Sequence, residues 1–205
     1  MSRVQLDLIS LCMELSDGLP VPKLFTSDTE VIESDFKASA QTSIFRKTAS
    51  VPLRVLLEEN LIQGSVLNFG KGKWDTDSAC IRAVTGNCQD YDYTWAPTDI
   101  VGRHFSCVYA GYVLNTLPWR SRQVVWKKIA DATDTKNGTA FIAVRSDKDK
   151  GIRGTNFEDG VITSRNTFQI GFSEAQILNE ASCFFSSCRV LCNKQNFILV
   201  SCRHR

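Results

Sequence analysis

The chain has 205 residues, of which 43% are hydrophobic and 22% are charged, and its formal net charge is +2. A chain of this length and composition can bury a large core without disulfides or metal ions, which excludes a disordered or fibrous protein. No window reaches the ~18 uninterrupted apolar residues of a membrane span, and the amino terminus lacks a basic segment followed by an apolar one. We therefore expect a cytoplasmic protein with no membrane partner.

The first 50 residues are predicted to form an acidic, helical or irregular appendage to a domain that spans residues 51–205. An amphipathic pattern over residues 4–15 predicts a short helix, and Pro20 and Pro22 then predict a turn. Residues 1–35 hold seven acidic residues against two basic ones. The sequence leaves open whether this segment is a lid, a dimer contact or a partner-binding arm.

From residue 53 onward, predicted helices and strands alternate. The patterns indicate helices over residues 53–61, 75–84, 118–133 and 173–181, with Asp75 or Thr76 as the cap of the second, and strands over residues 65–69, 90–93, 105–109 and Thr139–Arg145. Residues 183–192 and 196–202 are two further strands joined by a polar turn, which predicts a terminal antiparallel hairpin. The alternation predicts an α/β, Rossmann-like doubly wound fold with a mostly parallel sheet.

Basic residues form three loose groups after the acidic residues 1–35. They can attract a polyanion such as nucleic acid, or they are solvated helix faces and tails. The groups are Lys37, Arg46, Lys47 and Arg54; Arg120, Arg122, Lys127 and Lys128; and Arg189, Lys194, Arg203 and Arg205.

The eight cysteines include no Cys-x-x-Cys pair, so the sequence lacks a common zinc pattern. We expect mostly reduced, buried thiols and no metal ion. An alternative gathers Cys188, Cys192, Cys202 and His204 round a metal ion, provided that the last two strands pair in one particular register.

The apolar run Val66-Leu67-Asn68-Phe69 is followed by Gly70-Lys71-Gly72-Lys73, the form of a cofactor-binding turn. Glycines let the backbone turn sharply and approach a ligand, although a tight turn without a ligand has the same pattern. Asp92 lies 22 residues after Gly70, about the spacing at which a carboxylate binds the ribose of a nucleotide cofactor. Asp90 can play the same part, and the aromatic residues nearby offer planar surfaces for adenine: Tyr91, Tyr93 and Trp95.

The residues after the turn restrict which class of cofactor can bind. A phosphate-binding loop requires Ser or Thr after Gly70-Lys71, but Gly72 stands there. A dinucleotide site requires a third glycine at the start of the helix, where the chain has Trp74-Asp75-Thr76-Asp77. Carboxylates repel phosphate but tolerate S-adenosylmethionine, which carries an ammonium and a sulfonium group. A dinucleotide-binding oxidoreductase is the further alternative.

The sequence resembles class I S-adenosylmethionine-dependent methyltransferases, and within them small bacterial and phage methyltransferases. The resemblance covers residues 47–169 and rests on residues 47–53, 66–73, 91–92 and 112–118, followed by a helix with Arg122 and then by residues 143–147 on the fifth strand. Two departures are Asn68, where the family usually has an acid, and Trp74, which displaces the third glycine. Asp75 or Asp77 can substitute for the missing acid.

The resemblance implies direct in-line transfer of a methyl group to an unidentified acceptor, either a nucleic acid or a small molecule. Positioning supplies most of the acceleration in such a reaction. Asn115 would orient an amine or amide acceptor and Tyr112 would stack on a planar one; the simpler alternative is a turn in which the Asn115 amide caps the next helix. The cofactor-binding candidates are Asn68, Phe69, Gly70, Gly72, Lys73, Trp74, Asp90, Tyr91, Asp92, Tyr93, Ala110 and Gly111.

Residues 151–169 are predicted to form the acceptor-side loop, with an ordinary surface loop as the alternative. The segment is glycine-rich and follows a strand, where open α/β sheets place their substrates. The substrate-binding candidates are Arg145, Arg153, Arg165, Phe168 and Gln169, of which the arginines and Gln169 can bind phosphate or carboxylate. Asn68 and Trp74 also favour an alternative function, a catalytically silent protein that binds or sequesters S-adenosylmethionine.

Overall fold

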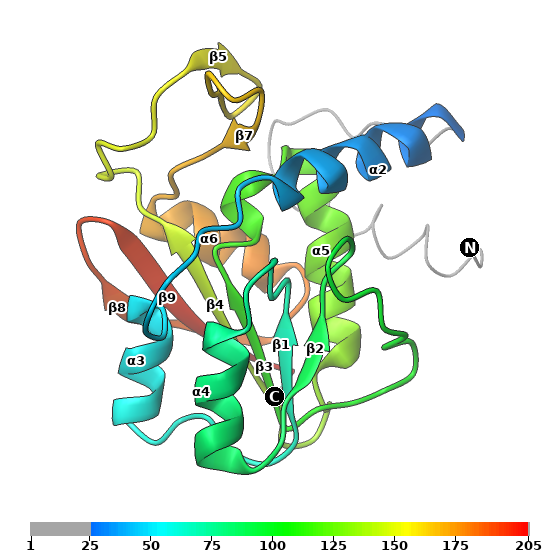
Figure 1. Ribbon diagram of the computed structural model, residues 1–205, viewed down its shortest axis with the longest axis vertical. Coiled ribbons are helices and arrows are strands. Elements are labelled where there is room, and N and C mark those ends of the chain that lie inside the picture. The colour runs from blue at the N-terminus through cyan, green and yellow to red at the C-terminus, as the bar shows by residue number, and fades with distance from the viewer. Residues whose placement is uncertain (1–25, 205) are drawn as a thin grey trace. The chain divides into compact units, whose positions relative to one another are not determined.

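The computed structural model describes residues 26–204, and its central feature is a six-stranded sheet between two layers of helices (Figure 1). The strands run in the order β2-β1-β3-β4-β9-β8. The first four are parallel, and β9 is antiparallel to both β4 and β8. These strands are β1 (Val66–Phe69), β2 (Gln89–Tyr91), β3 (Cys107–Gly111), β4 (Thr139–Arg145), β8 (Ser187–Asn193) and β9 (Phe197–Arg203). The predicted α/β class, the mostly parallel sheet and the terminal hairpin are confirmed.

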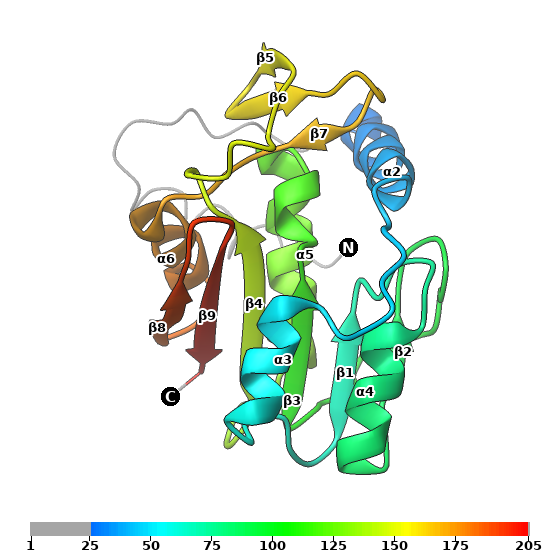
Figure 2. The same cartoon turned by 60° about the vertical axis from the view of Figure 1, so that its left-hand side comes forward.

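Alternate residues of the strands supply two apolar clusters, one on each face of the sheet. Val66, Cys107 and Tyr109 pack with helices α3 (Val51–Glu58) and α4 (Thr76–Thr85). Leu67, Val108 and Ile142 pack with helices α5 (Trp119–Ala132) and α6 (Glu174–Ser182). Figure 2 shows the two helix layers on opposite sides of the strands. The sheet is therefore buried on both faces, as a parallel sheet requires.

The ends of several elements differ from the predicted ones for local reasons. Helix α3 begins before Pro52, because proline is tolerated in the first turn of a helix, and it ends before Asn60, whose φ is 52°. Asp75 occupies the cap position of α4, but its side chain forms no capping hydrogen bond and pairs with Lys71 instead. Strand β4 has the predicted bounds.

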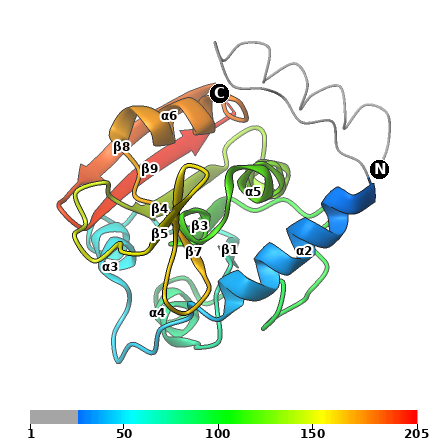
Figure 3. The ribbon, with the colours of Figure 1, turned by 90° about the horizontal axis from the view of Figure 1, so that it is seen from above.

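Two parts of the fold were not predicted. Helix α2 (Thr26–Ala40) lies in the segment predicted as an appendage, and the predicted acceptor-side loop contains a second, antiparallel sheet. Its strands are β5 (Thr155–Phe157), β6 (Gly160–Ile162) and β7 (Phe168–Gln169). Figure 2 and Figure 3 show this small sheet beyond the carboxyl ends of β3 and β4, where an open α/β sheet places its ligands.

The chain divides into two units, Met1–Val31 and Ile32–Arg205, and the sheet and its helices belong to the second. Residues 32–50, assigned to the appendage from the sequence, thus belong to the unit that carries the α/β fold. The predicted helix over residues 4–15 and the turn at Pro20 and Pro22 lie outside the described residues. Within residues 26–204, no helix is both long and apolar enough to cross a membrane.

Candidate active site

A cavity of about 690 Å³ lies at the carboxyl ends of β1, β2 and β3. Four parts of the chain line it: the end of α2 with the loop that follows, the turn after β1, the segment after β3, and the residues around β5–β7. Ligand-binding clefts span roughly 300–1,000 Å³. The cavity therefore has room for a cofactor and a small second molecule.

The turn after β1 forms one wall of this cavity. Gly70 and Gly72 have φ angles of 68° and 71°, which glycine adopts readily. The Gly70 N–H donates to the Tyr91 carbonyl at 2.7 Å, so the turn is fixed to the end of β2. A Cβ atom on Gly70 would lie 2.4 Å from Val113 Cγ2. The backbone thus passes close to the segment after β3, and a side chain at position 70 would collide with it.

The Asp92 carboxylate is held in the same wall by three backbone N–H groups. Its Oδ2 accepts from Gly72 at 2.9 Å, and its Oδ1 accepts from Thr94 and Trp95, each at 2.9 Å. An ionised carboxylate has about four acceptor positions, so capacity for a ligand hydroxyl remains. The structure therefore brings Asp92 and the glycine turn together, as the sequence predicts.

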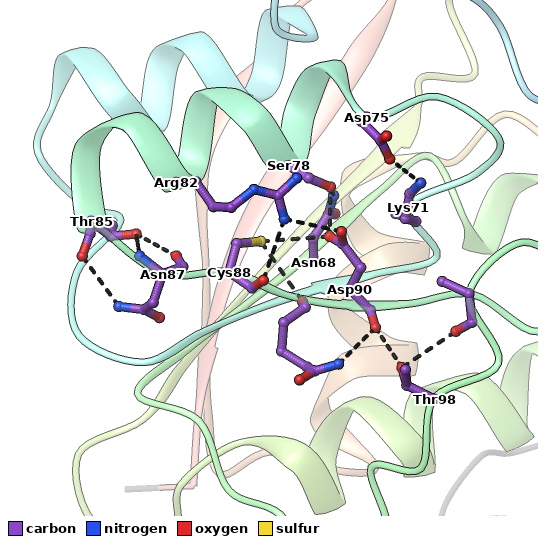
Figure 4. Close-up of polar contacts among 12 residues, drawn as sticks. Asn68, Lys71, Asp75, Ser78, Arg82, Thr85, Asn87, Cys88, Asp90 and Thr98 are labelled. Carbon is purple, nitrogen blue, oxygen red and sulfur yellow. Dashed lines mark hydrogen bonds and ion pairs between the residues drawn. The ribbon is translucent and has the colours of Figure 1, made fainter.

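Asn68 and Asp90 do not line the cavity, and their side chains point toward α4 (Figure 4). The Asn68 side chain is 3% exposed and donates to Ser78 Oγ at 2.9 Å. Ser78 Oγ in turn donates to Asp90 Oδ1 at 2.6 Å, and Arg82 pairs with Asp90 at 3.2 Å. Successive strand residues face opposite sides of a sheet, so these two contribute to the packing of α4 rather than to the cavity wall.

Of the other predicted cofactor-binding residues, some line the cavity and some do not. Trp74 lines the cavity but is 40% exposed and packs edge-on against Phe45, so its indole does not fill the turn. Lys73 lies over the rings of Trp74 and Trp95, outside the lining, and Ala110 is fully buried in the core. The predicted residues that do line the cavity are Phe69, Gly70, Gly72, Trp74, Tyr91, Asp92, Tyr93 and Gly111.

Tyr112 lines the cavity with a backbone conformation that is rare for a bulky residue. Its φ is 63°, and its N–H donates to the Ala143 carbonyl at 2.7 Å. Such strain is common at functional sites, where the surrounding structure enforces it. Burial raises the pKa of Tyr112 to about 12, so the phenol stays protonated at neutral pH. Tyr112 can therefore donate a hydrogen bond to a ligand but cannot act as a base there.

Asn115 lines the cavity, is nearly fully buried and joins three elements. Its Oδ1 accepts from the Arg145 N–H at 3.3 Å, and its Nδ2 donates to Gln169 Oε1 at 3.4 Å. Its carbonyl accepts from the Ile170 N–H at 2.9 Å. The alternative in which Asn115 caps the next helix is wrong, because α5 has Pro118 at its cap position. These contacts suit a residue that positions β7 against β4.

All three predicted acceptor-side arginines line the cavity. Arg145 pairs with Asp149 at 2.8 Å and donates to Gln169 at 3.2 Å, whereas Arg153 and Arg165 are exposed. Gln169 also lines the cavity. Phe168 does not: it is buried against Phe157, at a ring-centroid distance of 6.4 Å.

No family model and no curated protein matches the sequence, but solved structures share its fold. The chain is similar to 1,6-didemethyltoxoflavin-N1-methyltransferase of Burkholderia thailandensis, solved with 1,6-didemethyltoxoflavin and S-adenosylhomocysteine. The TM-score is 0.58 and the identity 12%, over 90% of this chain and 92% of that chain.

Two further structures give the same result. The sugar N-methyltransferase KedS8 from a Streptoalloteichus species has a TM-score of 0.53 at 11% identity, over 93% of this chain and 96% of that chain. The protein DhpI, in a complex with SAM and HEP, has a TM-score of 0.51 at 15% identity, over 88% of this chain and all of that chain. This chain has the class I methyltransferase fold. At such low identity the likeness concerns the fold alone.

Three basic cavity residues were not among the predicted site residues of this methyltransferase fold: Lys71, and Arg46 and Lys128, which the sequence placed in the loose basic groups. Asp77, one of the two residues predicted to substitute for the missing acid at position 68, also lines the cavity. Arg46 lies on the loop before α3, next to residues 47–53, which carry part of the resemblance. That adjacency is a signal which could have identified it. Lys71 lies between the two glycines, and Asp77 belongs to the acidic first turn of α4.

Arg122 is fully buried, so it cannot belong to the basic surface group in which the sequence placed it. It donates to Glu180 on α6 at 2.9 Å, to the Leu117 carbonyl at 2.9 Å, and to Asp159 in the turn between β5 and β6. A single guanidinium therefore joins the two helices behind the sheet to the small sheet beside the cavity.

The metal alternative for the last cysteines is wrong. Among residues 26–204, no three His, Cys, Asp or Glu side chains are arranged to hold a metal ion. A β-bulge between Val190 and Cys192 shifts the register of β8. As a result Cys188 packs against the cluster under α6, while Cys192 packs against the opposite one.

We expect Gly70→Ala to destabilise the methyltransferase fold more than Gly86→Ala does. Both glycines have positive φ, which costs an alanine about 1–2 kcal/mol. Only Gly70 has a neighbour in the way, because a Cβ on Gly86 meets no atom within 4 Å. Urea denaturation of the two variants measures the difference in the free energy of unfolding. Equal losses would show that the approach of Val113 to position 70 is not tight.

Proposed function

We propose that this protein is an S-adenosylmethionine-dependent methyltransferase that transfers the methyl group directly, in line, to a small-molecule acceptor. One observation carries the proposal: the glycine turn with Asp92 and the polar residues around β5–β7 line one cavity. A cofactor bound at the first wall and an acceptor bound at the second would then meet next to Tyr112. The shared fold supports this function.

The charges near the glycine turn suit a cationic cofactor. Asp92 and Asp77 both line the cavity, and Asp77 is held by the Ser50 N–H and hydroxyl, each at 2.7 Å. Two carboxylates attract an ammonium or sulfonium group and repel a pyrophosphate, which argues against the dinucleotide alternative. We assign Asp92 to the ribose hydroxyls of the cofactor and Asp77 to its ammonium group.

When bound, the cofactor supplies an electrophilic methyl group, and the protein has to hold the acceptor in line with it. Orientation of this kind accounts for a large share of the rate in bimolecular reactions. The protonated Tyr112 hydroxyl can fix the acceptor by donating a hydrogen bond. Residues around the small sheet and in the loop after α2 line the cavity and would limit the access of water to a bound acceptor.

The catalytically silent alternative was favoured by Asn68 and Trp74. Since Asn68 faces α4 and Trp74 leaves the turn open, neither residue obstructs the cavity. We therefore place the active enzyme first. If the protein is catalytically silent, it should bind the cofactor without transferring its methyl group, and the next experiment measures both.

Two measurements test the proposal. Calorimetry should detect binding of S-adenosylmethionine and S-adenosylhomocysteine but not of NAD. Radiolabelled S-adenosylmethionine should then transfer label into a small-molecule fraction of a cell extract, counted beside nucleic-acid and protein fractions. Label in nucleic acid would instead support the prediction drawn from the basic residues. Binding of NAD alone would contradict the proposal.

A further inference from the structure

The wall of the cavity carries an excess of positive charge. Of the described residues that line it, six are cationic and three are acidic. The cationic residues are Arg46, Lys71, Lys128, Arg145, Arg153 and Arg165, and the acidic ones are Asp77, Asp92 and Asp149. The excess is concentrated on the acceptor side, where Asp149 is the acidic residue and is already paired with Arg145.

Three of these arginines have no carboxylate partner within residues 26–204. Lys71 pairs with Asp75 and Arg145 with Asp149, whereas the guanidinium groups of Arg46, Arg153 and Arg165 form no ion pair there. They come from two separate segments, the loop before α3 and the residues around β5–β7, and meet at the same cavity. Guanidinium groups that converge without carboxylates are typical of a site for a carboxylate or phosphate ligand.

Arg46 is the best placed of the three. Its backbone carbonyl accepts from Thr76 Oγ1 at 2.8 Å, which fixes the loop to the start of α4. Arg46 is half-buried, and its guanidinium carbon lies 5.7 Å from the centre of the Tyr112 ring. A partly buried charge without a partner is costly, and a bound anion would offset that cost.

We propose that the methyl acceptor is a small anion whose carboxylate or phosphate-type group binds Arg46, with Arg153 and Arg165 at its outer side. This inference rests on the proposed function, since it names the molecule that would share the cavity with the cofactor. S-adenosylmethionine has a net charge of +1, so an anionic partner would balance the charges that meet there. In the transfer, a lone pair of the acceptor forms the bond to the methyl carbon, the carbon–sulfur bond breaks, and its electrons stay on sulfur. A proton on the acceptor atom passes to water.

The test uses the full chain saturated with S-adenosylhomocysteine. Benzoate and phenyl phosphate are the anionic probes, and benzamide and benzylamine are their neutral and cationic counterparts. We expect at least one anion to bind in calorimetry, about tenfold or more tightly than benzamide and benzylamine, because hydrogen bonds to charged groups are the stronger ones. Whether benzoate or phenyl phosphate binds more tightly shows whether the site recognises a carboxylate or a phosphate group.

Arg46→Gln should weaken the binding of that anion about tenfold or more and leave the dissociation constant of S-adenosylhomocysteine unchanged. Lys47→Gln is the matched control: it removes the same charge from the next residue, which is exposed and does not line the cavity. Thermal unfolding checks that both variants fold.

Three results would overturn the inference: no binding of either anion at millimolar concentration, equal binding of benzamide, or equal effects of Arg46→Gln and Lys47→Gln. A failure of S-adenosylhomocysteine itself to bind is a different outcome, because it contradicts the proposed function as well.

Discussion

Arg122→Met should lower the free energy of unfolding by about 3–5 kcal/mol, the usual cost of removing one partner of a buried ion pair. The Arg122 side chain is fully buried and donates to both carboxylate oxygens of Glu180, which is 4% exposed. Without the guanidinium, the Glu180 carboxylate keeps Trp126 Nε1 as a donor, at 3.0 Å, but loses its countercharge. Urea denaturation measures the loss.

The double variant Arg122→Met/Glu180→Gln tests whether charge is the cause. Glutamine keeps an oxygen that can accept from Trp126 and carries no charge, so most of the lost stability should return. If the double variant is as unstable as Arg122→Met alone, then lost packing against Trp119 and Phe172 explains the effect instead.

The loss of stability in Arg122→Met should depend on pH. Burial raises the pKa of Glu180, while Arg122 lowers it. In Arg122→Met the lowering by Arg122 is lost, so the pKa of Glu180 in the folded state lies further above the ordinary 4.5. The folded state then favours a protonated Glu180, and this stability is lost as pH rises through the raised pKa. The stability gap between variant and parent should therefore shrink as pH falls from neutral toward about 4.5.

Asp92→Ala should reduce the affinity for S-adenosylhomocysteine about 10- to 150-fold, which corresponds to the ~1.5–3 kcal/mol of a hydrogen bond to a charged group. The substitution removes the proposed ribose partner and also the acceptor for the Gly72, Thr94 and Trp95 N–H groups. Calorimetry measures the change.

Asp99→Ala is the matched control for this prediction. Its Oδ1 also accepts a backbone N–H, from Val101 at 2.9 Å, but Asp99 does not line the cavity. Its affinity for S-adenosylhomocysteine should equal that of the parent. An unchanged affinity in Asp92→Ala would show that the ribose assignment is wrong.

Most of the central sheet could be predicted because β1, β3, β4 and β9 are largely apolar and buried. Strand β4 is buried over nearly its whole length and has the predicted bounds. The small sheet could not be predicted in this way, since β5 is exposed at all three residues and no strand in it exceeds three residues. Helix α2 was missed because its sequence is polar and only weakly amphipathic.

The sequence predicted the part of the candidate site that lies at the ends of neighbouring parallel strands. It did not predict which side chains of those strands point toward the cavity. Gly70 and Asp92 meet because β1 and β2 are parallel neighbours whose carboxyl ends lie at one edge. Asn68 and Asp90 belong to the same motifs, yet their side chains point to the other face. Arg46 reaches the cavity through the packing of a loop on α4, a long-range contact, and its one local signal is its position beside residues 47–53.

The bulge in β8 affects how readily this protein aggregates at high concentration. Within residues 26–204 the main sheet ends at β2, which has three residues, and at β8, which the bulge interrupts. Short or irregular outer strands are poor templates for a strand from another molecule. The fold therefore resists edge-to-edge aggregation and amyloid-like growth through strand addition, a hazard to which open sheets with long, flat borders are exposed.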